Sequence, residues 1–202
     1  MRTFDVKTGY RDLYAQVTTE FTQVDVPEMR YAAIDGTGTP DESADHVAAV
    51  EALYSAGYTE KFESKRYLGC NFVVGPLEAL WHSDDPYASR RDATSWTMMI
   101  AQPEWITAEM LADAAATSHK KRKNPALERI RLTTVKEGRS VQVLHVGPYE
   151  EAGPTLARMY DEYLPEHGLT VAGPHHEIYL SDARRVPPEQ RRTILRRPVR
   201  PL

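Results

Sequence analysis

The chain has 202 residues and a formal net charge of −4, from 25 Lys and Arg against 29 Asp and Glu. Its 41% hydrophobic and 27% charged residues are typical of a folded protein and exclude a disordered one. No run approaches the ~18 apolar residues of a membrane span, and the first residues form no apolar signal segment. The single cysteine, Cys70, excludes an intrachain disulfide and a cysteine-rich metal site. These features predict a cytoplasmic protein.

The first half of the chain predicts a strand, a helix and two further strands. Apolar residues nearly alternate over Met29–Asp35, which is the period of a half-buried strand. Ser43 is a candidate N-cap for a helix over Ala44–Ala56, which we expect Gly57 to end. The two strands expected after this helix are Pro76–Trp81 and Ser95–Gln102.

The second half repeats this order after a connecting segment. The connection is predicted to be a helix over Thr107–Arg122, capped by Thr107, followed by an additional strand over Leu127–Val135. The elements expected in the repeat are a strand over Ser140–Val146, a helix over Glu151–His167, and strands over His176–Leu180 and Arg192–Val199.

Two such units predict an α+β fold. We expect a duplicated β-α-β-β module with pseudo-twofold symmetry, in which antiparallel sheets carry the helices on one side. A ligand cleft is expected between the modules, because such interfaces often bind ligands. The expected single domain, 1–202, consists of an N-terminal extension (1–25), a first module (26–106), a connecting helix and loop (107–126) and a second module (127–202).

Six segments, in this order, make the chain resemble the GyrI-like small-molecule-binding proteins: VDVPEMRYAAIDGTG, AVEALYSAGY, PLEALW, WTMMIAQPEWIT, VLHVGPYEE and HHEIYLSDARR. The resemblance covers about Phe21 to Val199 and implies the duplicated fold. It also implies multidrug binding, that is, the binding of bulky, hydrophobic and often cationic or polyaromatic molecules. One branch of the family hydrolyses cyclopropane-bearing genotoxic natural products. Because about 25 residues precede the first module, we expect a stand-alone member without a DNA-binding domain.

Glu177 is the first candidate site residue. In a strand it shares one face with Tyr179, and a carboxylate that faces a cleft is costly unless it meets a donor or a cation. The residues alone leave open a solvent-facing glutamate, whereas the resemblance favours the cleft. Glu78 has the matching place in the first unit, so we expect the two carboxylates to approach each other. The alternative for Glu78 is a surface ion pair.

Aromatic residues are candidates for the walls of the cleft, because ring faces attract both flat apolar molecules and cations. Large aromatic residues also form ordinary cores, and their sequence positions do not separate the two roles. The candidates are Trp81, Trp96, Tyr149, Tyr179 and Tyr54.

The leading hypothesis is a cofactor-free protein that binds hydrophobic or cationic small molecules in an acidic, aromatic cleft. The alternative is a hydrolase that opens the cyclopropane ring of a genotoxic natural product, with Glu177 and Tyr149 as the catalytic pair. The sequence does not separate binder from enzyme. No metal site is expected, since the adjacent His175 and His176 would point to opposite faces of a strand. The partner expected is a small-molecule ligand, with no membrane; a macromolecular partner stays open.

Overall fold

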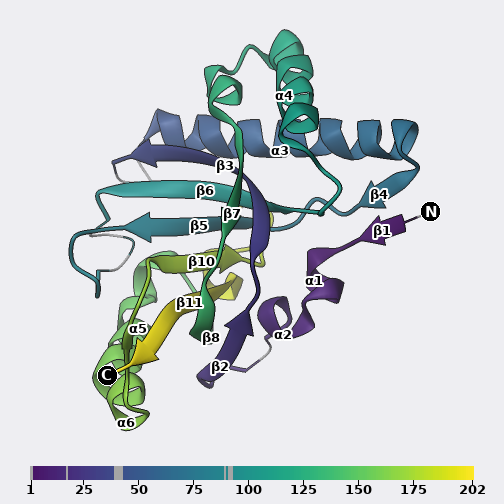
Figure 1. Ribbon diagram of the computed structural model, residues 1–202. Helices are drawn as coiled ribbons and strands as arrows, with labels where there is room; N and C mark the ends of the chain where they lie inside the picture. The colour runs from purple at the N-terminus through teal and green to yellow at the C-terminus, as the bar shows by residue number, and fades with distance from the viewer. Residues whose placement is uncertain (1, 17, 39–42, 89, 91–92) are drawn as a thin grey trace.

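The computed structural model describes residues 2–16, 18–38, 43–88, 90 and 93–202 (Figure 1). The strands of its main sheet are β2 (Thr22–Val26), β3 (Met29–Thr37), β5 (Leu77–His82), β6 (Ser95–Gln102), β7 (Arg131–Val135), β8 (Gly138–Val146), β9 (Leu169–Val171), β10 (His175–Tyr179) and β11 (Arg192–Pro201). They lie in the order β2–β8–β11–β10–β5–β6–β3–β7, with β9 beside β11, and each pair is antiparallel. A separate parallel pair joins β1 (Arg2–Phe4) to β4 (Cys70–Phe72).

The helices are α1 (Val6–Gly9), α2 (Arg11–Tyr14), α3 (Ala44–Tyr67), α4 (Ala108–Arg122), α5 (Gly153–Arg158) and α6 (Leu164–Glu166), with a π-helical turn, Met159–Tyr163, between the last two. Short 3₁₀ turns cover Pro125–Arg129, Tyr149–Glu151 and Pro188–Gln190. The predicted α+β class with antiparallel pairing is therefore confirmed. The duplication itself stays a prediction.

Two helix N-caps agree with the sequence prediction, but the C-terminal end of one helix does not. The side chains of Ser43 and Thr107 accept hydrogen bonds from the backbone N–H groups of His46 and Met110, as expected of N-caps. The prediction that Gly57 ends the first helix is wrong, since α3 continues to Tyr67. Gly57 instead lies where α3 packs closely: a Cβ there would be 3.4 Å from the side chain of Val74.

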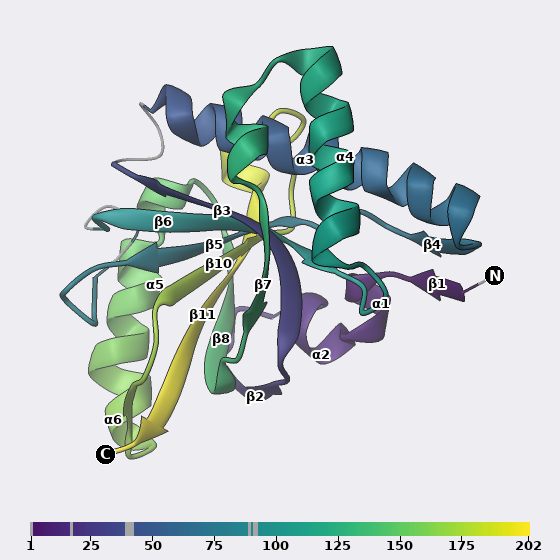
Figure 2. The same cartoon turned by 45° about the horizontal axis from the view of Figure 1, so that its top comes forward.

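The sheet is strongly curled (Figure 2). β2 and β3 lie near opposite ends of the strand order, yet the residues between them are just Pro27 and Glu28. Two residues also connect β7 to β8. Because three peptide steps span at most about 11 Å, the two ends of the sheet must lie close together, and the sheet has an inner and an outer face.

The predicted strand over Leu127–Val135 is shorter than expected. Its first part forms the 3₁₀ turn Pro125–Arg129, which the side chain of Asn124 caps by accepting from the N–H of Ala126. The strand β7 begins at Arg131. Proline at the first position of the turn favours this start, because it fixes φ and lacks the N–H that a strand ladder would use.

The longer helices cover the outer face of the sheet. One row of paired residues crosses six strands on that face: Val143, Leu195, Glu177, Ala79, Met98 and Ile34. The apolar members of this row pack in two cores, one with α3 and α4 and the other with the stretch from α5 to α6. The expectation of helices on one side holds for these elements, but α1 and α2 pack on the inner face through Val6, Leu13 and Tyr14.

Among the described residues, no helix combines the length and the apolar character that are needed to cross a membrane.

Candidate functional site

Strand β10 presents alternate residues to the two faces of the sheet. Glu177 pairs with Ala79 of β5, whereas Ile178 pairs with Glu78. Paired residues share a face, so Glu177 faces outward and Glu78 faces inward. The prediction that these two carboxylates approach each other is therefore wrong. The sequence comparison matched Glu78 of PLEALW to Glu177 of HEIYL, one residue away from its partner in the sheet, Ile178. A shift of one residue along a strand moves every side chain to the other face.

Glu177 is a buried carboxylate with two fixed donors. It is 3% exposed. Its Oε1 lies 3.0 Å from Nε2 of His175, and its Oε2 accepts a hydrogen bond of 2.7 Å from the hydroxyl of Tyr179. Burial acts to raise the pKa of Glu177, but the hydrogen bond from His175, the charge of Arg90 and the Tyr179 hydroxyl together hold that pKa below its usual value. Glu177 is therefore ionised at neutral pH.

His175 is the neutral partner of this carboxylate. It is 1% exposed, and burial lowers its pKa despite the neighbouring carboxylate of Glu177. Because a carboxylate can only accept, the Nε2–H group of His175 donates to Glu177. Nδ1 of His175 has no hydrogen-bond partner among the described residues and is the acceptor nitrogen of this tautomer. The ring thus orients Glu177 without adding a charge.

Aromatic rings and a guanidinium group lie near Glu177. The ring of Tyr149 meets that of Tyr179 edge to face, with centroids 5.3 Å apart. The guanidinium carbon of Arg90 lies 5.4 Å from the ring centroid of Trp81 and 4.9 Å from that of Tyr149. These residues, with His175 and Glu177, are called the Glu177 cluster below. Burial raises the pKa of Tyr149, against the charges of Arg191 and Arg90, so its hydroxyl keeps its proton.

The connection between β5 and β6 is tied to the second half of the chain beside this cluster. Arg197 of β11 is 2% exposed and donates to the carbonyl of Ala88 at 3.0 Å. The same guanidinium donates to the hydroxyl of Tyr160 and to the carbonyl of Gly173. Arg197 therefore fixes the segment that carries Arg90 close to β11.

Trp96 belongs to the core instead of the cluster. It is 1% exposed, its ring meets that of His46 edge to face, and it lies directly over Gly36. A Cβ at Gly36 would be 2.1 Å from the ring, so only glycine fits there. Tyr54 is half-buried on α3 and packs against the same core as Leu77 and Tyr179. The structure thus brings Glu177, Tyr179, Tyr149 and Trp81 together, places Tyr54 at the margin and Trp96 opposite Trp81 on the neighbouring strand, and separates Glu78 from them.

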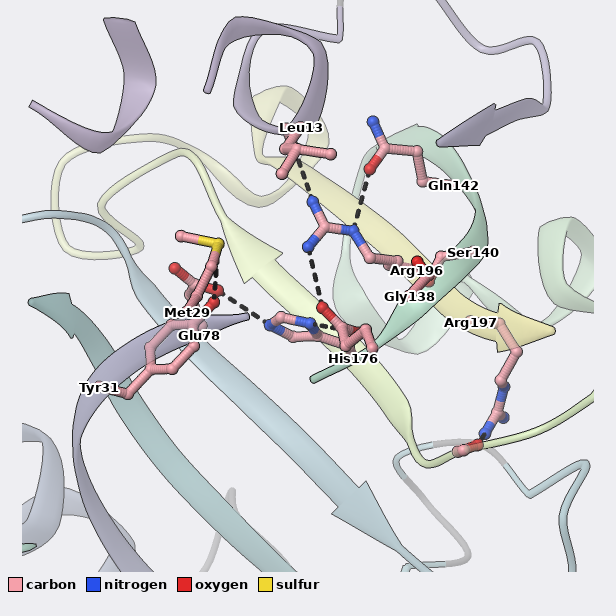
Figure 3. Close-up of polar contacts among 12 residues, drawn as sticks. Leu13, Met29, Tyr31, Glu78, Gly138, Ser140, Gln142, His176, Arg196 and Arg197 are labelled. Carbon is pink, nitrogen blue, oxygen red and sulfur yellow. Dashed lines mark hydrogen bonds and ion pairs between the residues drawn. The ribbon is translucent and has the colours of Figure 1, made fainter. Parts of the chain in front are cut away.

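The inner face carries a different buried polar group, the Glu137 network (Figure 3). His176 lies between two carboxylates, with Nε2 2.9 Å from Glu78 and Nδ1 3.0 Å from Glu137. Arg196 donates to Glu137 at 3.1 Å. Burial opposes a charge on His176, but the charges and hydrogen bonds of Glu137 and Glu78 raise its pKa to about 9. Burial likewise opposes a charge on Glu137, whose pKa His176 and Arg196 nevertheless lower to about 2.

The Glu137 network attaches the N-terminal segment to the sheet. Arg196 donates to the carbonyl of Leu13 at 2.8 Å, and the hydroxyl of Tyr14 donates to Glu78 at 2.7 Å. Two acidic and two basic side chains balance each other here, and all four are at most 3% exposed. Sequence reasoning missed Arg196 and Glu137, although an arginine within the apolar run of β11 indicates a buried partner.

The described residues form no metal-ligand group, and one cavity lies apart from the Glu177 cluster. Within the described ranges, no group of three or more His, Cys, Asp or Glu side chains is arranged to hold a metal ion. A cavity of about 740 Å³ lies between α2 and β2, on the opposite side of the sheet from Glu177. Its lining is formed by residues of 9–27, and none of them belongs to the Glu177 cluster.

Comparisons with known proteins agree with this architecture. The chain is 37% identical to the proteins in two crystal structures, each described as a hydrolase from Listeria innocua. Each match covers 98% of this chain and 100% of the other, with TM-scores of 0.84 and 0.87. The C-terminal domain of EcmrR shares the fold at 12% identity, with a TM-score of 0.59 over 91% of this chain and 98% of that one. A comparison with curated protein sequences gives no match. The profile of the GyrI-like small-molecule-binding domain matches residues 19–200, and the chain therefore belongs to the GyrI-like small-molecule-binding family.

Proposed function

We propose that this small-molecule-binding chain is a hydrolase in which Glu177 activates water against a bulky aromatic electrophile. The observation that carries the proposal is the fixed, buried and ionised carboxylate of Glu177, with the ring of Tyr149 close by. A general base needs a defined orientation and its basic form at the working pH. His175 and Tyr179 supply the orientation through two uncharged donors, and the lowered pKa of Glu177 supplies the basic form.

The relatives give this proposal its second support. A protein described as a hydrolase aligns with nearly the whole chain at 37% identity. The resemblance to the GyrI-like family names a strained cyclopropane ring as one substrate group. We therefore propose that the electrophile is a cyclopropane conjugated to a carbonyl, within a molecule large enough to contact Trp81 and Tyr149.

The reaction balances with one molecule of water. Glu177 takes a proton from water as the hydroxide oxygen attacks a cyclopropane carbon. The bond from that carbon to the ring carbon conjugated with the carbonyl breaks, and its electron pair moves through the conjugated system to the carbonyl oxygen. The Tyr149 hydroxyl, which burial keeps protonated, donates a hydrogen bond to that developing oxyanion. The proton held by Glu177 completes the product, which is the substrate plus water.

Binding of lipophilic cations without turnover is the second candidate. The anionic Glu177 and the rings of Trp81 and Tyr149 are the groups that attract organic cations. Two guanidinium groups already lie over these rings, those of Arg90 and Arg191. A further cation would be repelled by both, and for this reason the hydrolase stands first.

Turnover of a cyclopropane-bearing alkylating compound tests the proposal. Sub-stoichiometric protein should convert an excess of compound to a product heavier by one water, as followed by mass spectrometry. Glu177→Gln should slow turnover by roughly 100- to 10,000-fold, the usual loss of a general base, and Tyr149→Phe should also slow it. The exposed Glu166 provides a matched control, since Glu166→Gln should leave the rate unchanged. Recovery of the compound intact, at any ratio of compound to protein, would contradict the hydrolase.

A further inference from the structure

The Glu177 cluster and its immediate surroundings together contain more positive than negative charge. Glu177 contributes one negative charge, whereas Arg90 and Arg191 lie over its aromatic rings and Arg197 is hydrogen-bonded beside it. The nearby carboxylates of Asp85 and Glu150 are exposed, so solvent and salt screen them. A buried carboxylate alone would predict a site that selects cations. The arginines around Glu177 predict the opposite preference.

Arg90 occupies the position that an organic cation would take. Its guanidinium group stacks over two rings at once, at 5.4 Å from the Trp81 centroid and 4.9 Å from the Tyr149 centroid. Both distances are within the ~6 Å that a cation–π interaction requires. The same charge contributes to the lowered pKa of Glu177. Arg90 thus has both partners that an incoming cation would seek, the rings and the carboxylate.

The position of Arg90 depends on contacts that join the two halves of the chain. The backbone two residues earlier, at Ala88, is held by Arg197 of β11. Trp81 belongs to β5, and Tyr149 begins the 3₁₀ turn that precedes α5. Arg90 therefore lies among elements from both halves of the chain. A residue in this position can contact a ligand in a defined geometry, which specificity requires.

We propose that Arg90 determines the charge specificity of this site: its guanidinium group fills the cation position between Trp81 and Tyr149, so that the site accepts neutral or anionic aromatic molecules and rejects lipophilic cations. The inference rests on the proposed function only in placing the ligand at the Glu177 cluster. A neutral or anionic molecule can bind beside Arg90 and use its charge. A lipophilic cation must displace the Arg90 guanidinium group, and the interactions of that group with Trp81 and Tyr149 are then lost.

Two probes of nearly equal shape and opposite charge test this role: tetraphenylphosphonium and tetraphenylborate. Isothermal titration of the unmodified protein should give at least about tenfold tighter binding of the borate. Arg90→Met keeps the length and apolar stem of the side chain but removes the charge. We expect it to shift the ratio of the two affinities by about tenfold or more toward the phosphonium, whereas Arg90→Lys should keep the preference for the borate.

Arg158 provides the matched control. Its guanidinium group lies 5.4 Å from the Phe21 centroid, is more than half exposed, and is not part of the cluster, so Arg158→Met should leave the affinity ratio unchanged. Thermal unfolding shows whether each variant is folded, and Arg90→Gln replaces Arg90→Met if that variant is not. The proposal is overturned by an unmodified protein that prefers the phosphonium, by an unchanged ratio in the folded neutral variant, or by binding of neither probe. Because these affinities are read without turnover, failure of the hydrolase proposal would be seen separately.

Discussion

Two adjacent histidines, His175 and His176, occupy opposite faces of β10 and have opposite charge states. Both are almost completely buried, and each contacts a carboxylate. Burial lowers the pKa of His175, which is neutral beside one acid, Glu177. His176 lies between two acids, Glu78 and Glu137, and they raise its pKa to about 9. One additional carboxylate is therefore enough to outweigh the cost of burying the charge.

The inner and outer faces of the sheet differ in what their charged side chains contact. On the inner face, His176 and Arg196 compensate the charges of the two carboxylates. Their hydrogen bonds go to those carboxylates and, from Arg196, to Gln142 and the N-terminal segment. On the outer face, Glu177 keeps its negative charge through neutral donors and lies near aromatic rings and the guanidinium group of Arg90. The inner face is a structural network, whereas the outer face has the features of a site.

The largest effect that we expect on the inner face follows from removing Arg196. Arg196→Leu leaves Glu137 with a single cation and removes the hydrogen bonds to Gln142 and to the carbonyl of Leu13. Loss of one partner from a buried ion pair typically costs about 3–5 kcal/mol in the free energy of unfolding. Urea unfolding measures this loss, and the exposed Arg185→Leu is the control. A loss below about 1 kcal/mol would show that the network contributes little to stability.

A smaller effect is expected from pH. The pKa of His176 is raised to about 9, so its stabilising contribution is complete below the unfolded value near 6.5 and is lost as the pH rises to 9. The pKa of Glu137 is lowered to about 2, so its contribution is complete above the unfolded value near 4.5 and is lost as the pH falls to 2. The two contributions are together greatest between about pH 4.5 and pH 6.5.

The variant His176→Gln isolates the alkaline part of this dependence. Burial raises the pKa of Glu60 to about 8, which also weakens the fold as the pH rises, but Glu60 is common to both proteins and cancels in the difference. The stability advantage of the unmodified protein over His176→Gln should fall, by on the order of 1–3 kcal/mol, between pH 6.5 and pH 9. Urea midpoints across this range provide the measurement. A constant advantage would mean that His176 is uncharged throughout.

Local signals predicted most of the fold. The caps at Ser43 and Thr107 and the strand Ser95–Gln102 agree with the sequence because they depend on neighbouring residues alone. The end of α3 was missed because tertiary packing continues the helix past Gly57, with buried residues on both sides of it. The N-terminal segment was expected to be a mere extension, since nothing local in it indicates that Arg196 binds the carbonyl of Leu13.

The candidate site was predicted in part. Alternation along β10 places Glu177 beside Tyr179, and this is readable from the sequence. The cross-strand partner of Glu177 depends on the register between β10 and β5. Register is a property of the pair of strands, so the sequence of one strand does not reveal it. Arg90 was not predicted either. It reaches the cluster from a connection that Arg197, more than 100 residues later, contacts at the carbonyl of Ala88.

One paired measurement tests the central claim that the outer face acts on the ligand and the inner face maintains the fold. Glu177→Gln and Glu78→Gln each remove one buried carboxylate charge, from opposite faces of two adjacent strands. Turnover per folded molecule and the urea midpoint are measured for both. The account predicts that Glu177→Gln loses turnover with little change in the midpoint, and that Glu78→Gln lowers the midpoint with turnover retained. Loss of turnover in fully folded Glu78→Gln, with turnover intact in Glu177→Gln, would contradict it.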